Sequence, residues 1–204
     1  MILIGYSGHA FVVNSILLSK GLRATGYCDN EEKKHNPYAL PYHGSENSEQ
    51  GLEALSREPF FVAIGDNAIR QRVQDAMLQH LLYPANVIHA NAWIDPQAVI
   101  AECGVMIGAN VVIQPLSQIG RGVICNTNAV IEHECRVGDF AHIGPGAILC
   151  GNVHIGAGSF VGAGAIVKEN IRIGKAVTIG AGAVVVKDVP DHATVVGNPA
   201  RNLK

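Results

Sequence analysis

Between residues 107 and 190 an aliphatic residue recurs at every sixth position, and this period constrains the fold more than any other feature of the chain. A glycine often follows these residues directly, and the residue two positions earlier is small or a valine. Neither a helix, with about 3.6 residues per turn, nor a strand, with a repeat of about two, produces such a period. Cys125 is the one position in this series that is not aliphatic. The series is Ile107, Ile113, Ile119, Cys125, Ile131, Val137, Ile143, Leu149, Ile155, Val161, Val167, Ile173, Ile179 and Val185.

A period of six predicts a parallel β-helix, in which a short strand and a tight corner repeat and equivalent side chains stack from coil to coil. With about three repeats per coil, the tract forms a triangular prism of about four to five coils. A disordered, glycine-rich tract would not keep its apolar residues in phase. Residues 195–204 break the period, and we expect them to cap the last coil, because an open end exposes strand edges.

Before the repeat, strands alternate with helices, which predicts a small Rossmann-like parallel sheet. We expect strands over residues 2–4, 24–28 and 60–64 and helices over residues 10–19 and 68–81, whereas residues 30–56 cross the surface with at most a short strand or helix. The first of these helices has one apolar side, formed by Val12, Val13, Ile16 and Leu17.

The chain therefore divides into a Rossmann-like domain at residues 1–83 and a β-helix domain, with its cap, at residues 84–204. Aliphatic residues at Ile88, Ile94 and Ile100 indicate that irregular first coils begin soon after the boundary.

Composition excludes several classes of function. The net charge is −2 and the 15 Lys and Arg residues are scattered, which argues against a nucleic-acid surface. No apolar run approaches the roughly 20 residues that cross a bilayer, and no targeting segment precedes the first strand, so we expect a cytoplasmic protein with a small-molecule ligand and no membrane partner. The five cysteines show no CxxC spacing and predict neither disulfides nor a zinc knuckle; Cys125 and Cys135 occupy inward core positions.

All three predicted strands of the N-terminal sheet end in small or polar residues, and ligands of open parallel sheets bind at such ends. A glycine turn at a helix N-terminus suits a phosphate, and an acidic residue about 20 positions later can accept from a ribose hydroxyl or a base N–H. Glycine in a βα turn can also serve geometry alone. The candidate residues are Gly5, Ser7, Gly8 and His9 after the first strand, Asp29 and Asn30 after the second, and Gly65, Asp66 and Asn67 after the third.

Charged residues and histidines concentrate in the tract NTNAVIEHECRVGDFAHIGPGAILCGNVHIG. In the six-residue frame His133 lies at or beside a corner, whereas His142 points outward from a different face, so the two meet only across a subunit contact. A ring of three chains would bring a corner of one against a face of the next. His133 can act as a general base if Glu132 or Glu134 orients it, and the frame does not choose between them. The alternatives are a merely solvated histidine and a metal site made with His154, whose spacing is atypical.

These residues together resemble the left-handed β-helix acyltransferases of the sialic acid O-acetyltransferase-like group. The segments IGYSGHA, CDN, AIGDNAIR and NTNAVIEHECRVGDFAHIGPGA look like those of UDP-4-amino-sugar N-acetyltransferases of bacillosamine biosynthesis, although CDN differs from the paired aspartates expected there. The resemblance covers the whole chain and implies a homotrimer with active sites between subunits, acetyl-CoA as co-substrate and no metal.

The resemblance also implies roles for individual residues. His133 would be the general base and Glu134 its partner, with the Gly151 N–H as the oxyanion donor. The acceptor amine would attack the thioester directly, without an acyl-enzyme. His142, Gly151, Ala163 and Ala181 would bind acetyl-CoA, and Gly5, Ser7, Gly8, His9, Asp29, Asn30, Gly65, Asn67 and Asn126 would bind the UDP-sugar.

Two other functions fit the same sequence. One is a sialic acid O-acetyltransferase, which shares the fold and a similar histidine. The other is a non-catalytic scaffold that binds a sugar nucleotide.

Overall fold

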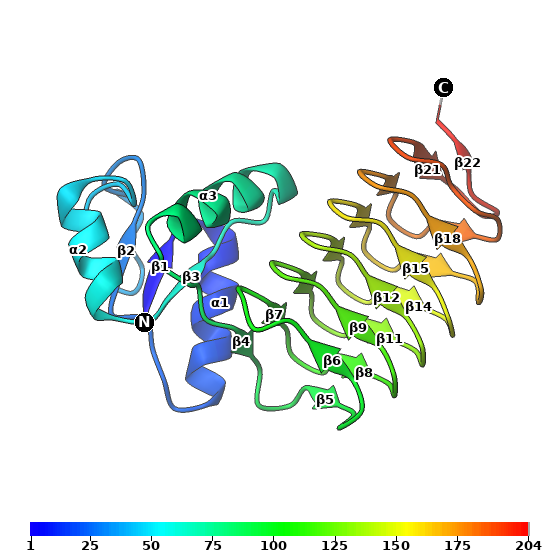
Figure 1. Ribbon diagram of the computed structural model, residues 1–204, viewed down its shortest axis with the longest axis horizontal. Coiled ribbons are helices and arrows are strands. Elements are labelled where there is room, and N and C mark those ends of the chain that lie inside the picture. Colours follow the sequence, from blue (N-terminus) through cyan, green and yellow to red (C-terminus); the bar gives the residue numbers. More distant parts are fainter. Residues whose placement is uncertain (204) are drawn as a thin grey trace.

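A computed structural model describes residues 1–203, which form a small α/β part followed by a long prism (Figure 1). The α/β part is a sheet of three parallel strands in the order β2-β1-β3, connected by helices, as the sequence predicts. Its elements are β1 (Ile2–Ile4), α1 (Gly8–Ser19), β2 (Gly26–Cys28), α2 (Glu49–Arg57), β3 (Phe60–Val62) and α3 (Asn67–Gln79).

Local capping explains where two of these helices begin. The Ser48 hydroxyl accepts a hydrogen bond from the Gly51 N–H at 3.1 Å, and the Asp66 carboxylate accepts one from the Ile69 N–H at 2.8 Å. Helix α2 lies in the segment expected to be mostly loop, and it is stable there because Leu55 on it is buried against the sheet. One predicted detail is wrong: Val12 is 38% exposed, and the buried side of α1 is formed instead by Ala10, Val13, Ile16 and Leu17.

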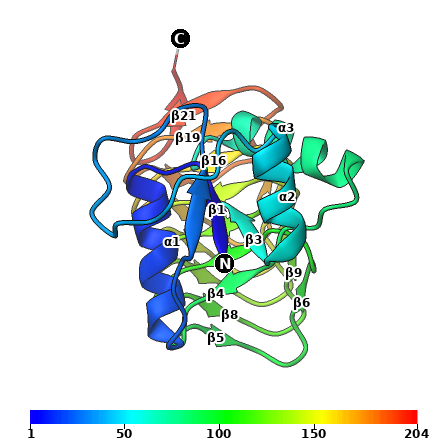
Figure 2. The same cartoon turned by 90° about the vertical axis from the view of Figure 1, so that its left-hand side faces the viewer.

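Helices cover both faces of the small sheet, with α1 on one side and α2 and α3 on the other (Figure 2). Side chains of α2 and α3, such as Leu55 and Met77, pack on Ile2 and Ile4. On the other side, α1 and Leu3 of the sheet pack together with Met106 and Ile124, which belong to the prism. The α/β part is therefore joined to the prism through a continuous apolar core.

The prism is a parallel β-helix with three faces, and consecutive strands from β4 to β21 lie on different faces. Face 1 contains β4 (Val87–Ile88), β7 (Met106–Ile107), β10 (Ile124–Cys125), β13 (His142–Ile143), β16 (Phe160–Val161), β19 (Thr178–Ile179), β21 (Thr194–Val196) and β22 (Arg201–Asn202). Face 2 contains β5 (Trp93–Ile94), β8 (Val112–Ile113), β11 (Val130–Ile131), β14 (Ile148–Leu149), β17 (Ile166–Val167) and β20 (Val184–Val185). Face 3 contains β6 (Val99–Ile100), β9 (Gln118–Ile119), β12 (Arg136–Val137), β15 (His154–Ile155) and β18 (Arg172–Ile173).

The period of six is the inward row of this prism, as predicted, and it includes the irregular first coil at Ile88, Ile94 and Ile100. The small residues two positions earlier, such as Ala129 and Ala141, are also fully buried. Cys125 and Cys135 are core residues, and burial raises the pKa of these thiols to about 12 and about 11. Neither thiol is therefore activated as a nucleophile.

Corners of the prism require left-handed backbone conformations, which asparagine tolerates better than most residues. Asn128, Asn152 and Asn170 have φ values of 59°, 57° and 64°. Their side chains also bond from coil to coil, with the Asn152 amide donating to Asn170 Oδ1 at 2.9 Å. After the last coil, β21 and β22 pair antiparallel as the expected cap; Lys204, also assigned to it, lies outside the described residues.

The residue before each inward aliphatic points outward, and these outward rows differ between the faces. On face 1 the row begins with Val87, Met106 and Ile124, which the α/β part buries. On face 3 the row is mostly polar, with Gln118, Arg136, His154 and Arg172. On face 2 every member is apolar, and Trp93 and Ile166 are 60% and 37% exposed; the row is Trp93, Val112, Val130, Ile148, Ile166 and Val184.

Within residues 1–203, no helix has the length and apolar character of a membrane span.

Candidate functional site

His133 and Glu134 form a pair at the corner between face 2 and face 3. Strand β11 ends at Ile131, and the chain turns before β12. Glu134 has a φ of 62° at this turn, and its Oε2 atom lies 3.1 Å from Nδ1 of His133. Because a carboxylate only accepts hydrogen bonds, Nδ1 carries a proton in this contact, and in the neutral imidazole the lone pair is then on Nε2. The repeat frame does not choose between Glu132 and Glu134 as the partner of His133. In the structure the partner of the imidazole is Glu134.

Gly151 occupies the equivalent corner one coil further along, directly against the His133 ring. A Cβ at position 151 would lie 2.6 Å from both Cε1 and Nε2 of the imidazole, closer than real Cβ contacts allow. Any larger residue at position 151 would displace the His133 ring, so glycine allows the ring to lie against the main chain here. The His133 ring is supported on two sides, by a carboxylate and by the Gly151 main chain.

Ala163 and Ala181 lie at the opposite edge of face 2, at the corners that follow β16 and β19 of face 1. Both are exposed, and their neighbours Gly164 and Gly182 have open space where a Cβ would be. Small residues therefore leave this edge open, with room along it for an extended ligand.

His142 lies on face 1, separated from His133 as the sequence predicts. It points outward from the prism, yet only 8% of it is exposed because the α/β part covers it. Its Nδ1 atom lies 3.4 Å from the Gly65 carbonyl oxygen, and its Nε2 atom lies 3.2 Å from Nδ2 of Asn126. The carbonyl can only accept and the amide nitrogen can only donate, so the ring is the neutral tautomer protonated at Nδ1.

His9, on α1, lies beside His142 with the ring centroids 6.3 Å apart. Its Nε2 atom is buried and, within the described residues, has no hydrogen-bond partner. Burial lowers the pKa of each imidazole to about 4, with a further contribution from the nearby Arg70 cation. Two neutral histidines therefore lie at the junction of the α/β part and the prism.

The strand ends of the small sheet form a separate cavity of about 270 Å³ that includes Gly5, Asp29 and Asn30. The Asp29 carboxylate is already engaged there. Its Oδ2 atom accepts from the Tyr6 N–H at 2.9 Å, and its Oδ1 atom accepts from the Asn30 N–H and from Lys33 Nζ. Asp29 thus organises the loops around the cavity. The α1 N-terminus lies outside this lining, and Ser7 and Gly8 are exposed there.

A second cleft, of about 540 Å³, lies between the α3 N-terminus and face 1, and Gly65, Asn67, Phe160 and Thr178 line it. The Asn67 amide donates to the carbonyl oxygens of Gly158 and Ser159, so it joins the two parts of the chain. Phe160 packs edge-on against His142 with the ring centroids 5.1 Å apart. Phe160 and the buried Arg70 are absent from the sequence-based candidates. The sequence signal for Phe160 is its position one residue before the inward Val161. The signal for Arg70 is its place at the end of the segment AIGDNAIR.

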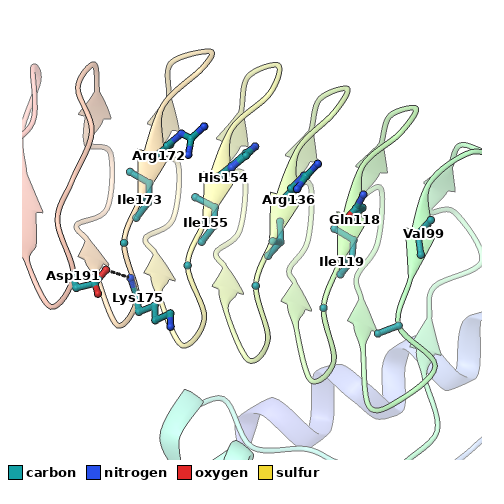
Figure 3. Close-up of a pocket in the computed structure, with 16 residues that line it drawn as sticks. Val99, Gln118, Ile119, Arg136, His154, Ile155, Arg172, Ile173, Lys175 and Asp191 are labelled. Carbon is teal, nitrogen blue, oxygen red and sulfur yellow. Dashed lines mark hydrogen bonds between the residues drawn. The ribbon is translucent and has the colours of Figure 1, made fainter.

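A third and larger hollow, of about 640 Å³, lies elsewhere, over face 3 (Figure 3). Gln118, Arg136, His154 and Arg172 stand in one row on consecutive coils along it (Figure 3). Apart from His154, which belonged to the alternative metal site, it contains none of the candidate residues, and it is open to solvent. Among residues 1–203, no three His, Cys, Asp or Glu side chains are gathered so that they could hold a metal ion.

The candidate residues thus fall into groups that one chain does not bring together. His133, Glu134 and Gly151 lie at one edge of face 2, and Ala163 and Ala181 lie at its other edge. Asn126 lies at the second edge too and connects it, through His142, to Gly65 of the α/β part.

Comparison with known proteins agrees with this architecture. Residues 1–77 match the family described as the PglD N-terminal domain, and residues 152–187 match bacterial transferase hexapeptide repeats. Perosamine N-acetyltransferase from Caulobacter crescentus, solved with CoA and GDP-perosamine, shares 35% identity at a TM-score of 0.92, over 100% of this chain and 96% of that one. The acetyltransferase domain of PglB from Neisseria gonorrhoeae, solved with acetyl coenzyme A, shares 33% identity at a TM-score of 0.88, over 99% and 98% of the two chains. The chain therefore belongs to the hexapeptide-repeat sugar N-acetyltransferases that carry a PglD-type N-terminal domain.

Proposed function

We propose that this protein transfers the acetyl group of acetyl-CoA to the 4-amino group of a UDP-linked amino-dideoxy sugar, in the cytoplasm, for the synthesis of a surface glycan or glycoprotein sugar. The observation that carries the proposal is the His133–Glu134 pair, whose ring lies against Gly151 at the edge of face 2. Relatives that bind CoA with GDP-perosamine, or acetyl coenzyme A, support this class of donor and acceptor.

The geometry supports direct transfer. In the neutral imidazole of His133, Nδ1–H donates to Glu134 and the lone pair on Nε2 can accept the proton of the attacking amine. The N–C bond forms as the amine attacks the thioester carbonyl carbon, and the C–S bond then breaks to release CoA thiolate, which takes up the proton from the imidazolium. The Gly151 main-chain N–H would stabilise the oxyanion of the intermediate.

The acceptor would bind from the α/β side. The glycine turn at Gly5, Ser7 and Gly8 and the cavity of Asp29 and Asn30 would hold the UDP group. Gly65, Asn67, His9 and Asn126 would line the path to the transferred amine, and His142 would contribute through Asn126. The pantetheine arm of the donor would lie along Ala163 and Ala181, which would form the donor channel together with the neighbouring chain.

The two edges of face 2 suggest a homotrimer. If the apolar faces 2 of three chains pack around a threefold axis, the His133 edge of one chain meets the Ala163 edge of the next. An apolar row of this length on one face is also typical of a subunit contact. Each active site would then contain His133, Glu134 and Gly151 from one chain and the donor channel from its neighbour.

A substrate panel tests the proposed reaction. With acetyl-CoA, we expect the highest kcat/KM for a UDP-4-amino-dideoxy sugar, a lower value for the GDP-linked analogue, and no turnover of free or CMP-linked sialic acid. Mass spectrometry of each product identifies the added acetyl group. Preference for the GDP-linked sugar would contradict the assignment of uridine as the nucleoside of the acceptor. Acetylation of sialic acid alone would favour the O-acetyltransferase. Binding without any turnover would favour a scaffold.

Variants of Glu134 test its role separately from folding. Glu134→Gly removes the carboxylate but also relieves a left-handed backbone, so we expect an unchanged or higher melting temperature and a turnover at least about tenfold lower. Leu116→Gly is the matched control, because Leu116 has a φ of 64° at the same corner one coil earlier, and its turnover should match the wild type. Wild-type turnover in Glu134→Gly would show that the carboxylate does not assist His133.

A further inference from the structure

Arg70, on α3, is the bulkiest side chain with complete burial in the protein. Its guanidinium has five N–H donors, and all five are used. Nε donates to the Gly122 carbonyl at 2.8 Å, Nη1 donates to the Ile64 and Gly65 carbonyls at 3.1 and 3.0 Å, and Nη2 donates to Asn67 Oδ1 and the Phe140 carbonyl at 2.9 Å each.

The acceptors come from both parts of the chain. Ile64 and Gly65 follow β3 of the small sheet, whereas Gly122 and Phe140 occupy the same corner of the prism on consecutive coils. Lysine, with three donors on a single nitrogen, cannot reproduce this fork. None of the five acceptors is a carboxylate, so the charge is buried without an ion pair. Burying such a charge costs stability, and a functional role would explain why it is kept.

A chain of hydrogen bonds connects Arg70 to the candidate site. The Gly65 carbonyl accepts from Arg70 Nη1 and also from Nδ1 of His142. Nε2 of His142 accepts from the Asn126 amide, and Asn126 Oδ1 accepts from the Thr127 N–H. One N–H of the Asn126 amide remains for a ligand at the edge of the donor channel.

The charge of Arg70 acts on the same chain. The titratable groups that face His142 are His9 on α1 and Arg70 on α3. Burial lowers the pKa of His142 most, and the Arg70 cation lowers it further. A neutral imidazole is required for Nε2 to accept from Asn126, since the imidazolium has no lone pair to offer.

We propose that Arg70 is a positioning residue for acetyl transfer, which fixes the Gly65 carbonyl and thereby the orientation and tautomer of His142 and the amide of Asn126. The inference rests on the proposed function for its effect on turnover. Its effect on His142 is independent of the substrate.

Two variants test this role. We expect Arg70→Lys, which keeps the charge but not the fork, to lower kcat about tenfold or more, because small displacements of positioning groups have effects of this size. In Arg70→Met we expect, in addition, a raised His142 pKa, because the cation that opposes protonation is gone. The ring-nitrogen chemical shifts of His142, followed by NMR against pH, report both the tautomer and the pKa.

A double-mutant cycle with Asn126→Ala identifies the path. If Arg70 acts through Asn126, the double variant should lose clearly less kcat than the product of the losses in Arg70→Lys and in Asn126→Ala. Arg57→Met, on the exposed surface of α2, is the control and should match the wild type in kcat and in the His142 signals.

The proposal is overturned if Arg70→Lys keeps wild-type kcat, or if its kcat falls while the His142 signals stay unchanged and the two losses multiply. Should Arg70→Met fail to fold, the Arg70→Lys results decide. A wild-type protein that acetylates no amino sugar would instead contradict the proposed function, and the His142 signals would still test the link to Arg70.

Discussion

Replacing His133 by alanine is expected to lower kcat at least about a hundredfold, within the usual range for loss of a general base. The acceptor amine must lose a proton as it attacks, and Nε2 of His133 is the base that the proposed geometry offers to it. Because the side chain lies at an exposed corner and supports no core contact, the fold should be unaffected. Steady-state kinetics with saturating acetyl-CoA and amino sugar measure the change, and KM should change much less than kcat.

His154→Ala is the control for this experiment. His154 belongs to the same β-helix, but it stands in the outward row of face 3 and not at the corner of His133 and Gly151. The His154→Ala variant should retain wild-type turnover. Near-normal kcat in His133→Ala would show that another group removes the proton or that the amine needs no base.

The sequence was sufficient to predict the prism because its core is periodic. Every inward position from Ile107 to Val185 is set by the same local rule, and each coil repeats the contacts of the one before it. The small sheet was predictable in type but not in its boundaries. Helix α2 was hard to predict because its helical signal is short and its stability comes from Leu55 packing on strands distant in sequence.

The candidate site was only partly predictable, for a different reason. The pairing of His133 with Glu134 depends on the left-handed backbone at residue 134, which a repeat frame does not specify. The role of Arg70 was hidden because four of its five acceptors are main-chain carbonyls, and those of Gly122 and Phe140 lie 52 and 70 residues away. A carbonyl oxygen carries no signature in the sequence.

Face 2 did have a sequence signal that is easily overlooked. Val112, Val130, Ile148, Ile166 and Val184 recur every 18 residues, one position before an inward aliphatic. The corresponding positions on face 3 are mostly polar, and those on face 1 are apolar where the α/β part covers them. An outward apolar row therefore marks a covered face, and on face 2 the proposed cover is another copy of the chain.

Ile148→Asp is expected to convert the proposed trimer into monomers and to lower turnover at least about a hundredfold, because a charge at the centre of an apolar interface is strongly unfavourable. Sedimentation velocity measures the assembly, and the same samples are assayed for turnover. His154→Asp places the same charge on face 3 of the same coil and should leave both unchanged. Fully active single chains, in the wild type or in Ile148→Asp, would contradict the proposed shared site.

Subunit complementation tests the sharing directly. His133→Ala lacks the base and Ala181→Trp blocks the donor channel, so each variant alone should be almost inactive. If each site combines the base of one chain with the channel of its neighbour, a site between an Ala181→Trp chain and a His133→Ala chain has both parts intact. Random mixed trimers should then recover about a quarter of wild-type activity, since about one in four neighbouring pairs has the productive order. If both parts came from the same chain, no mixture would recover activity, because every chain carries one defect.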